Sequence, residues 1–181
     1  MRGLLLLANG FEDVEAIATR DILIRGGVEV DLVSIYRSHK EVTSSHHLNV
    51  IANKTYDEID LKDYDFIILP GGGLGVKNLL QSNEVEEAVK YFMSKHMLVA
   101  AICAVPMVLG KYGYLKDKKF TCYQGCEVGI NGIYTGNEVE IVDNIITARS
   151  MKYSVLFGLT ILEKLLGKEI ANKVKKAIEG R

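Results

Sequence analysis

Residues 98–106 read LVAAICAVP. The first five form an apolar run of strand length, and residues at helical spacing begin directly after Cys103. A strand that runs into a helix through one sharp turn is the geometry of a nucleophile elbow, which lifts a reactive side chain above the edge of a sheet. A lone cysteine in an apolar run is more often a core residue. The junction position, with two loops expected beside it, favours Cys103 as a nucleophile.

The chemistry expected of Cys103 follows from its place before a helix. Free N–H groups and the dipole at a helix N-terminus favour a thiolate over a thiol. Pro106 suits the first turn of that helix, where its missing N–H leaves no hydrogen bond unmade. We therefore expect the pKa of Cys103 to be lowered.

Outward from this turn, apolar runs of strand length alternate with helix-period segments along the chain. Strands are expected at residues 3–8, 28–35, 65–69, 98–102, 119–122, 138–142 and 145–148, and helices at 14–25, 84–95, 104–112, 153–166 and 169–178. A small hairpin is expected around Val42 and residues 48–52. This alternation predicts an α/β fold, a doubly wound, mostly parallel sheet with helices on both faces. Residues 1–181 are interpreted as a single domain, with ligands expected beyond the carboxyl ends of the strands.

Composition argues against several classes of function. The chain has 181 residues, of which 48% are hydrophobic and 25% charged, and its formal net charge is −1. No basic bias suggests nucleic acid as a partner, and no apolar stretch approaches the ~20 residues of a membrane span. The apolar start fits a buried strand better than a signal peptide, because Glu12 and Asp13 follow closely. Cys103, Cys122 and Cys126 show no disulfide or metal pattern, so we expect reduced thiols, no metal and a cytoplasmic protein.

The first loop expected at the carboxyl edge of the sheet is residues 9–15, NGFEDVE. Glu12 and Asp13 suit a first helical turn, where they complement the helix dipole. Glu15 differs from them, because apolar residues surround it near the end of a strand. A solvated helix residue and a buried carboxyl at the site are equally good interpretations of Glu15.

The second loop is residues 70–75, PGGGLG. Glycines let a backbone approach a ligand closely and expose its N–H groups. The spacing matches neither a phosphate-binding P-loop nor a dinucleotide fingerprint. Taken alone, the loop is more typical of a tight turn without a ligand.

Three segments taken together resemble a known family. Residues 8–15, residues 69–75 with Asn78 and Leu79, and residues 100–106 are similar in order and spacing to the motifs of the ThiJ/PfpI superfamily, and within it to the DJ-one branch with its ThiJ-like proteins. The resemblance covers nearly the whole chain. It implies a single ThiJ/PfpI-like domain with the flavodoxin-like architecture of class I glutamine amidotransferases.

The resemblance also implies roles for particular residues. Cys103 matches the reactive cysteine, and Glu15 matches the glutamate that hydrogen-bonds its thiol. Burial should raise the pKa of Glu15 and keep it protonated. Backbone N–H groups of Gly72 and Ala104 match the oxyanion hole. The remaining pocket positions are Gly71, Tyr123 and Arg149, and no cofactor is implied.

The chain departs from the family pattern in two places. Many members have a histidine near the cysteine, at the position that Tyr123 takes here. None of His39, His46, His47 and His96 lies in a loop expected to reach Cys103, so a Cys-His-acid triad is not expected. The second departure is Ser150-Met151-Lys152, which replaces the Gly-Pro-Gly that usually follows the arginine.

The resemblance leaves three functions open. The first is a cofactor-free enzyme acting on reactive carbonyls, a glyoxalase III or deglycase that converts methylglyoxal to lactate and takes small aldehydes or glycated amines. The second is a non-catalytic sensor of oxidative stress, or a chaperone, that uses the same oxidisable Cys103. A PfpI-like protease is weaker, because that class has a histidine directly after the cysteine and this chain has Ala104. The family also implies a homodimer formed through the first helix and the Gly-rich loop.

Overall fold

A seven-stranded sheet forms the centre of the computed structural model, which describes all 181 residues. The strand order is β10-β11-β7-β6-β1-β2-β5, and every neighbouring pair is parallel except β10 with β11. These strands are β1 (Arg2–Leu7), β2 (Glu29–Ser34), β5 (Lys54–Thr55), β6 (Phe66–Leu69), β7 (Leu98–Ile102), β10 (Val139–Val142) and β11 (Ile145–Ala148). The mostly parallel α/β sheet expected from the sequence is confirmed.

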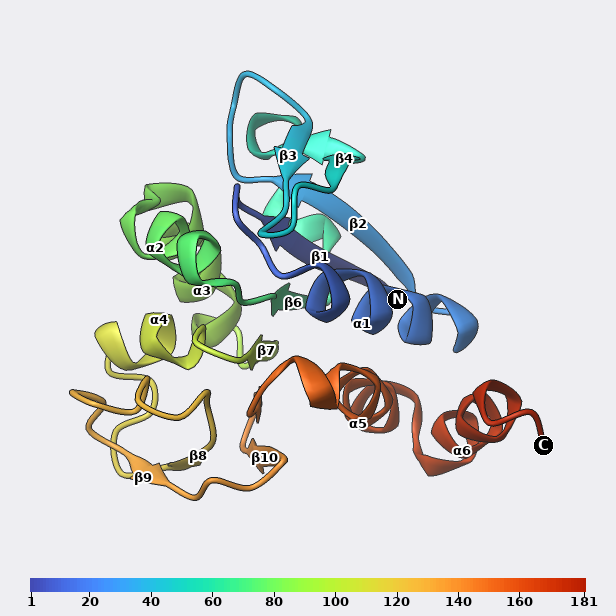
Figure 1. The fold of residues 1–181 in the computed structure, drawn as a ribbon. Coiled ribbons are helices and arrows are strands. Elements are labelled where there is room, and N and C mark those ends of the chain that lie inside the picture. The colour runs from blue at the N-terminus through green and yellow to red at the C-terminus, as the bar shows by residue number, and fades with distance from the viewer.

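Helices cover both faces of this sheet (Figure 1). One layer consists of α2 (Gly73–Gln81), α3 (Asn83–Ser94) and α4 (Pro106–Lys111), and the other of α1 (Asp13–Arg25), α5 (Ser154–Leu166) and α6 (Lys168–Ile178). Leu4 and Leu6 of β1 pack into the first layer, whereas Leu5 and Leu7 pack into the second. This alternation explains why β1 is apolar at every position from Leu4 to Leu7, since both of its faces are buried there. No helix is long and apolar enough to cross a membrane.

The smaller elements lie outside the main sheet. The expected hairpin is confirmed as the antiparallel pair β3 (Glu41–Thr43) and β4 (Asn49–Ile51). A second small pair joins β8 (Lys119–Phe120) to β9 (Ile133–Tyr134). Short 3-10 helices are found at η1 (Tyr56–Glu58), η2 (Leu61–Asp63) and η3 (Met151–Tyr153).

Several sequence expectations for these elements were wrong. Helix α2, strand β5 and strand β9 were not predicted at all, and the strand expected at 119–122 has only two residues and belongs to the small pair. The helix expected at 104–112 begins only at Pro106 and has six residues. Helix α2 was missed because glycines at its start interrupt the helical spacing of apolar residues. Only Val76 and Leu79, on its buried side, show that spacing.

Backbone hydrogen bonds join the loops at the carboxyl ends of β1, β6, β7 and β11. Glu12 N–H donates to Gly71 O at 2.9 Å, which ties the first loop to the Gly-rich loop. Cys103 N–H donates to Ala148 O at 2.9 Å, which ties the elbow to the end of β11. These bonds fix the loops relative to one another, as a site built from separate strands requires.

Gly72 is the tightest point of this arrangement. Its φ is +100°, and a Cβ there would lie 2.2 Å from Gly10 O. We expect Gly72→Ala to lower the free energy of unfolding by at least about 2 kcal/mol, through strained φ and displaced backbone. Urea denaturation measures this. The neighbouring Gly73→Ala is the control, because a Cβ there meets no atom within 4 Å, and an equal loss in both variants would contradict the assignment.

Candidate active site

Cys103 occupies a strained turn directly after β7. Its φ is +64°, a left-handed conformation that non-glycine residues adopt at a cost of order 1–3 kcal/mol. The turn follows Ile102, the last residue of the strand, and Pro106 begins α4 as its first residue. The expected elbow is therefore present, with the cysteine side chain partly buried at the carboxyl edge of the sheet.

Glu15 lies fully buried beside this turn, in the first part of α1. Its Oε2 accepts a hydrogen bond of 2.7 Å from Gly71 N–H. Its Oε1 is buried without a nitrogen or oxygen partner, and the carboxyl interacts with the Cys103 thiol. Of the two interpretations of Glu15, the structure supports the buried carboxyl.

Gly71 shapes this contact because it has no side chain. A Cβ at Gly71 would lie 2.6 Å from Glu15 Oε2 and 2.8 Å from Cys103 Cβ. Its N–H holds the Glu15 carboxyl, while the N–H groups of Gly72 and Ala104 lie against the thiol and favour its charged form. The three small residues that the resemblance implies at the site, Gly71, Gly72 and Ala104, therefore meet at the Glu15–Cys103 pair.

The environment raises the pKa of both acids in the pair. Burial raises the pKa of Glu15 to about 7, against the opposing hydrogen bonds from Gly71 and Cys103. Burial also raises the pKa of Cys103, and the negative charge of Glu15 raises it further. The N–H groups of Ala104 and Gly72 act in the opposite direction but do not prevail.

The expectation that a helix dipole lowers the pKa of Cys103 was therefore wrong. Helix α4 begins three residues beyond the cysteine and has only six residues, so its dipole is small and distant. The expectation that burial raises the pKa of Glu15 was correct. Two acids this close titrate as a unit, and the first proton leaves the pair near neutral pH. When Glu15 retains the remaining proton, the single charge is a thiolate that Gly72 and Ala104 stabilise.

The pair opens into a cavity of about 580 Å³. Glu15, Gly72, Cys103, Ala104 and Tyr123 all line it. Gly71 does not line the cavity, but its N–H donates to the Glu15 carboxyl that does. Arg149 lines a neighbouring cavity of about 650 Å³ instead.

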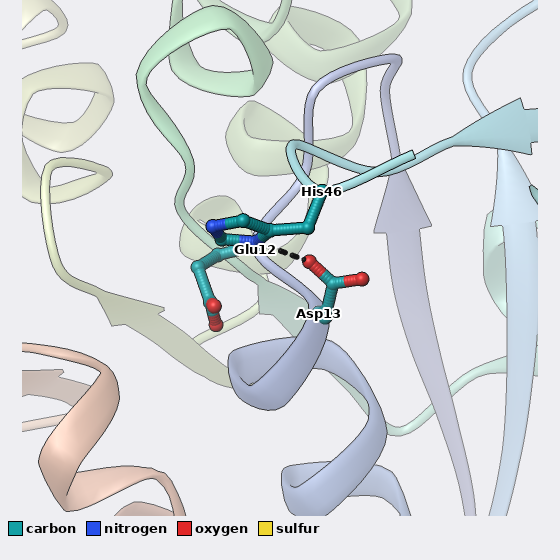
Figure 2. Close-up of side chains that lie close together, drawn as sticks. All are labelled: Glu12, Asp13 and His46. Carbon is teal, nitrogen blue, oxygen red and sulfur yellow. Dashed lines mark hydrogen bonds and ion pairs between the residues drawn. The ribbon is translucent and has the colours of Figure 1, made fainter. Parts of the chain in front are cut away.

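His46 also lines the Cys103 cavity, which corrects the expectation that no histidine lies in a loop reaching the cysteine. It is exposed at the turn between β3 and β4, and its Nδ1 lies 2.8 Å from Asp13 Oδ2 (Figure 2). Asp13 also accepts a 2.6 Å hydrogen bond from Ser44 Oγ. Ser45 N–H donates to Phe11 O at 2.8 Å, which docks the hairpin on the first loop.

Glu12, Asp13 and His46 have potential ligand atoms within 4.8 Å of one another. Figure 2 shows the imidazole next to both carboxylates, above the first turn of α1. Glu12 caps that turn by accepting a hydrogen bond from Glu15 N–H, and Asp13 holds Ser44 and His46. Hydrogen bonds within the protein thus account for this cluster, which we assign to docking the hairpin rather than to a metal.

All three cysteines are free. Cys122 is fully buried in the core, whereas Cys126 lines the Cys103 cavity. Lys152 lines it too, from the segment where the family usually has Gly-Pro-Gly.

Comparison with known proteins identifies this arrangement. The family model described as "DJ-1/PfpI family" matches residues 1–164. The chain belongs to the DJ-1/PfpI family. It is 33% identical over 179 residues to protein DJ-1alpha of Drosophila melanogaster, covering 97% of this chain and 82% of that one. It is 32% identical to the Parkinson disease protein 7 homolog of Danio rerio, covering 96% and 94% of the two chains.

Solved structures of the DJ-1/PfpI family share the fold. The chain is similar to Drosophila melanogaster DJ-1beta, with a TM-score of 0.92 at 30% identity over 98% of this chain and 96% of that one. Oxidised Toxoplasma gondii DJ-1 gives a TM-score of 0.91 at 28% identity, covering 98% and 97%.

His46 and Lys152 are the cavity residues that the sequence did not reveal. His46 reaches the cavity only because the β3–β4 hairpin docks on the first loop, a contact between segments more than 30 residues apart. No local pattern marks such a contact. The departure from Gly-Pro-Gly at Ser150-Met151-Lys152 was the available signal for Lys152.

The raised pKa of Glu15 predicts a pH-dependent stability. A folded-state pKa of about 7, against an ordinary 4.5, makes the folded protein lose stability as pH rises between those values, by up to about 3 kcal/mol. We expect Glu15→Gln to be more stable than the wild type at pH 8 by about 2–3 kcal/mol. The gap should close towards pH 5. Urea denaturation at both pH values tests this. The same difference in the free energy of unfolding between the two proteins at pH 5 and pH 8 would contradict the burial of an ionising carboxyl.

Proposed function

We propose that the protein is a cofactor-free, cysteine-dependent enzyme acting on small reactive carbonyl compounds. Its reaction would convert methylglyoxal to lactate, and the same chemistry on glycated amines would release the amine. The observation that carries the proposal is the contact between the buried Glu15 carboxyl and the Cys103 thiol at one end of an open cavity. A general base with a pKa near 7 suits proton transfer at neutral pH.

The first step uses the thiolate form of the pair. Cys103 sulfur bonds to the aldehyde carbon, and the carbonyl electrons move to oxygen, where the N–H groups of Gly72 and Ala104 stabilise the charge. Protonation of that oxygen by Glu15 gives a hemithioacetal. The same two N–H groups that hold the thiolate are thus available to the developing oxyanion.

The second step moves a proton between the two carbons. Glu15, now a carboxylate, takes the proton from the carbon bonded to sulfur, and the resulting enediol is reprotonated on the neighbouring carbon. This gives a thioester of lactate on Cys103. Water then cleaves the thioester, releasing lactate and restoring the thiol, so no external oxidant or cofactor is consumed.

We expect the wild type to form lactate from methylglyoxal without glutathione, and Cys103→Ser to form none above background. Cys126→Ser is the matched control, since Cys126 is a free thiol lining the same cavity without contact to Glu15. It should retain most of the wild-type rate. Lactate formed equally by Cys103→Ser, or lost only in Cys126→Ser, would refute the assignment of the nucleophile.

A redox sensor is the second candidate. It is favoured by the absence of a histidine at Tyr123 and by the oxidised state in which the Toxoplasma gondii relative was solved. Peroxide would oxidise the Cys103 thiolate to sulfenate and then sulfinate, which the same backbone donors can hold. Stoichiometric sulfinate on Cys103 by mass spectrometry, with no lactate formed, would favour the sensor. A PfpI-like protease finds no support, because Ala104 follows the cysteine.

We also propose that the chain forms a homodimer through α1 and the Gly-rich loop. Val14 and Ile17 of α1 and Leu74 of α2 are large apolar side chains exposed at 42%, 41% and 59%. Such exposed apolar side chains on adjacent elements suit an interface between copies.

A further inference from the structure

A second cavity, of about 650 Å³, adjoins the Cys103 cavity. Tyr123 and Ser150 line both, so the two spaces adjoin along these residues. Arg149 is the one charged residue that lines the second cavity. The mechanism above assigns it no role.

The Arg149 guanidinium has no acidic partner. Its NH1 donates to Gly136 O at 2.8 Å, and its NH2 donates to the hydroxyl of Tyr153. The guanidinium also stacks 4.8 Å above the Tyr153 ring. By contrast, Arg2 pairs with Asp31 and Arg37 with Glu84. A guanidinium has five N–H donors, so several remain free after these neutral contacts.

The contacts of Arg149 hold the charge in place before any ligand arrives. A guanidinium fixed by a carbonyl, a hydroxyl and an aromatic face loses little freedom on binding an anion. Arginine is well suited to planar, bidentate recognition of carboxylate and phosphate groups. The cavity therefore combines a positioned, uncompensated cation with room for a small anion.

Backbone hydrogen bonds place the residue that carries this cation next to the turn that carries the nucleophile. Cys103 N–H donates to Ala148 O at 2.9 Å, and Arg149 is the next residue. Tyr123 N–H donates to Cys103 O at 2.8 Å. Neighbouring strands lie about 5 Å apart, so the backbones of Arg149 and Cys103 are within the span of one small molecule.

We propose that Arg149 forms an anion subsite that holds a carboxylate or phosphate of the substrate while its carbonyl carbon faces Cys103. The proposal rests on the function proposed above and narrows its substrate class to carbonyl compounds carrying such an anionic group. Unsubstituted methylglyoxal would then be a minimal substrate that leaves this subsite empty.

The test compares two alkylating reagents that differ in charge. Iodoacetate and iodoacetamide each transfer their carbon to the Cys103 thiolate and displace iodide, but only iodoacetate has a carboxylate for Arg149. The readout is the ratio of the two rates at Cys103, followed by mass spectrometry. Because it requires no turnover, it stands or falls independently of lactate formation.

We expect Arg149→Gln to lower the iodoacetate-to-iodoacetamide ratio by at least about fivefold, with the iodoacetamide rate unchanged. Arg149→Lys should retain part of the ratio. Lys95→Gln is the matched charge control, because Lys95 follows α3 at the opposite, amino-terminal end of β7. An intact iodoacetamide rate also verifies that the variant keeps its thiol site.

Competition identifies the anion. Acetate or inorganic phosphate should slow iodoacetate saturably in the wild type and not in Arg149→Gln, and the anion that competes at lower concentration indicates which group the subsite prefers. A ratio unaltered in Arg149→Gln would overturn the proposal. A ratio that is lost only in Lys152→Gln would also overturn it, because the anion contact would then lie in the Cys103 cavity. The absence of saturable competition by either anion would overturn it as well.

Discussion

The carboxyl group of Glu15 is buried against the thiol of Cys103, and the loops at the carboxyl edge of the sheet hold the two groups together. Glu15 is completely buried, held through one oxygen by Gly71 N–H, and set against Cys103. Two acids in this position share a single negative charge near neutral pH. The fold must therefore exclude water from Glu15 while leaving an open cavity above the cysteine.

The surrounding backbone is shaped to permit this contact. Gly71 leaves room between the carboxyl and the cysteine, Gly72 adopts a φ of +100°, and Cys103 itself adopts a φ of +64°. Each of these features costs free energy locally. Two apolar cores of 24 buried residues each, one on either face of the sheet, offset that cost and hold the strand ends in place. The regular packing of the two cores thus stabilises the strained backbone of the site.

The sequence predicted the features that local patterns determine. Continuous apolar runs located β1 and β7, and the junction after Ile102 located the elbow. Glu15 could be narrowed only to two interpretations, because burial of a helix residue depends on the loop that packs over it. His46 was missed for the same reason, since a docked hairpin brings it to the cavity. The pKa of Cys103 was predicted in the wrong direction, because the sequence shows that a helix follows but not that α4 is short or that the thiol is buried.

The shared charge is tested most directly by the pH dependence of Cys103 alkylation by iodoacetamide, in the wild type and in Glu15→Gln. In the wild type the rate should rise along a single ionisation near pH 7, where the pair loses its first proton. In Glu15→Gln that ionisation should disappear, and the rate should instead rise along the ionisation of the buried thiol alone, with its inflection moved to higher pH. The same curve in both proteins would contradict the account, because Cys103 would then ionise without reference to Glu15.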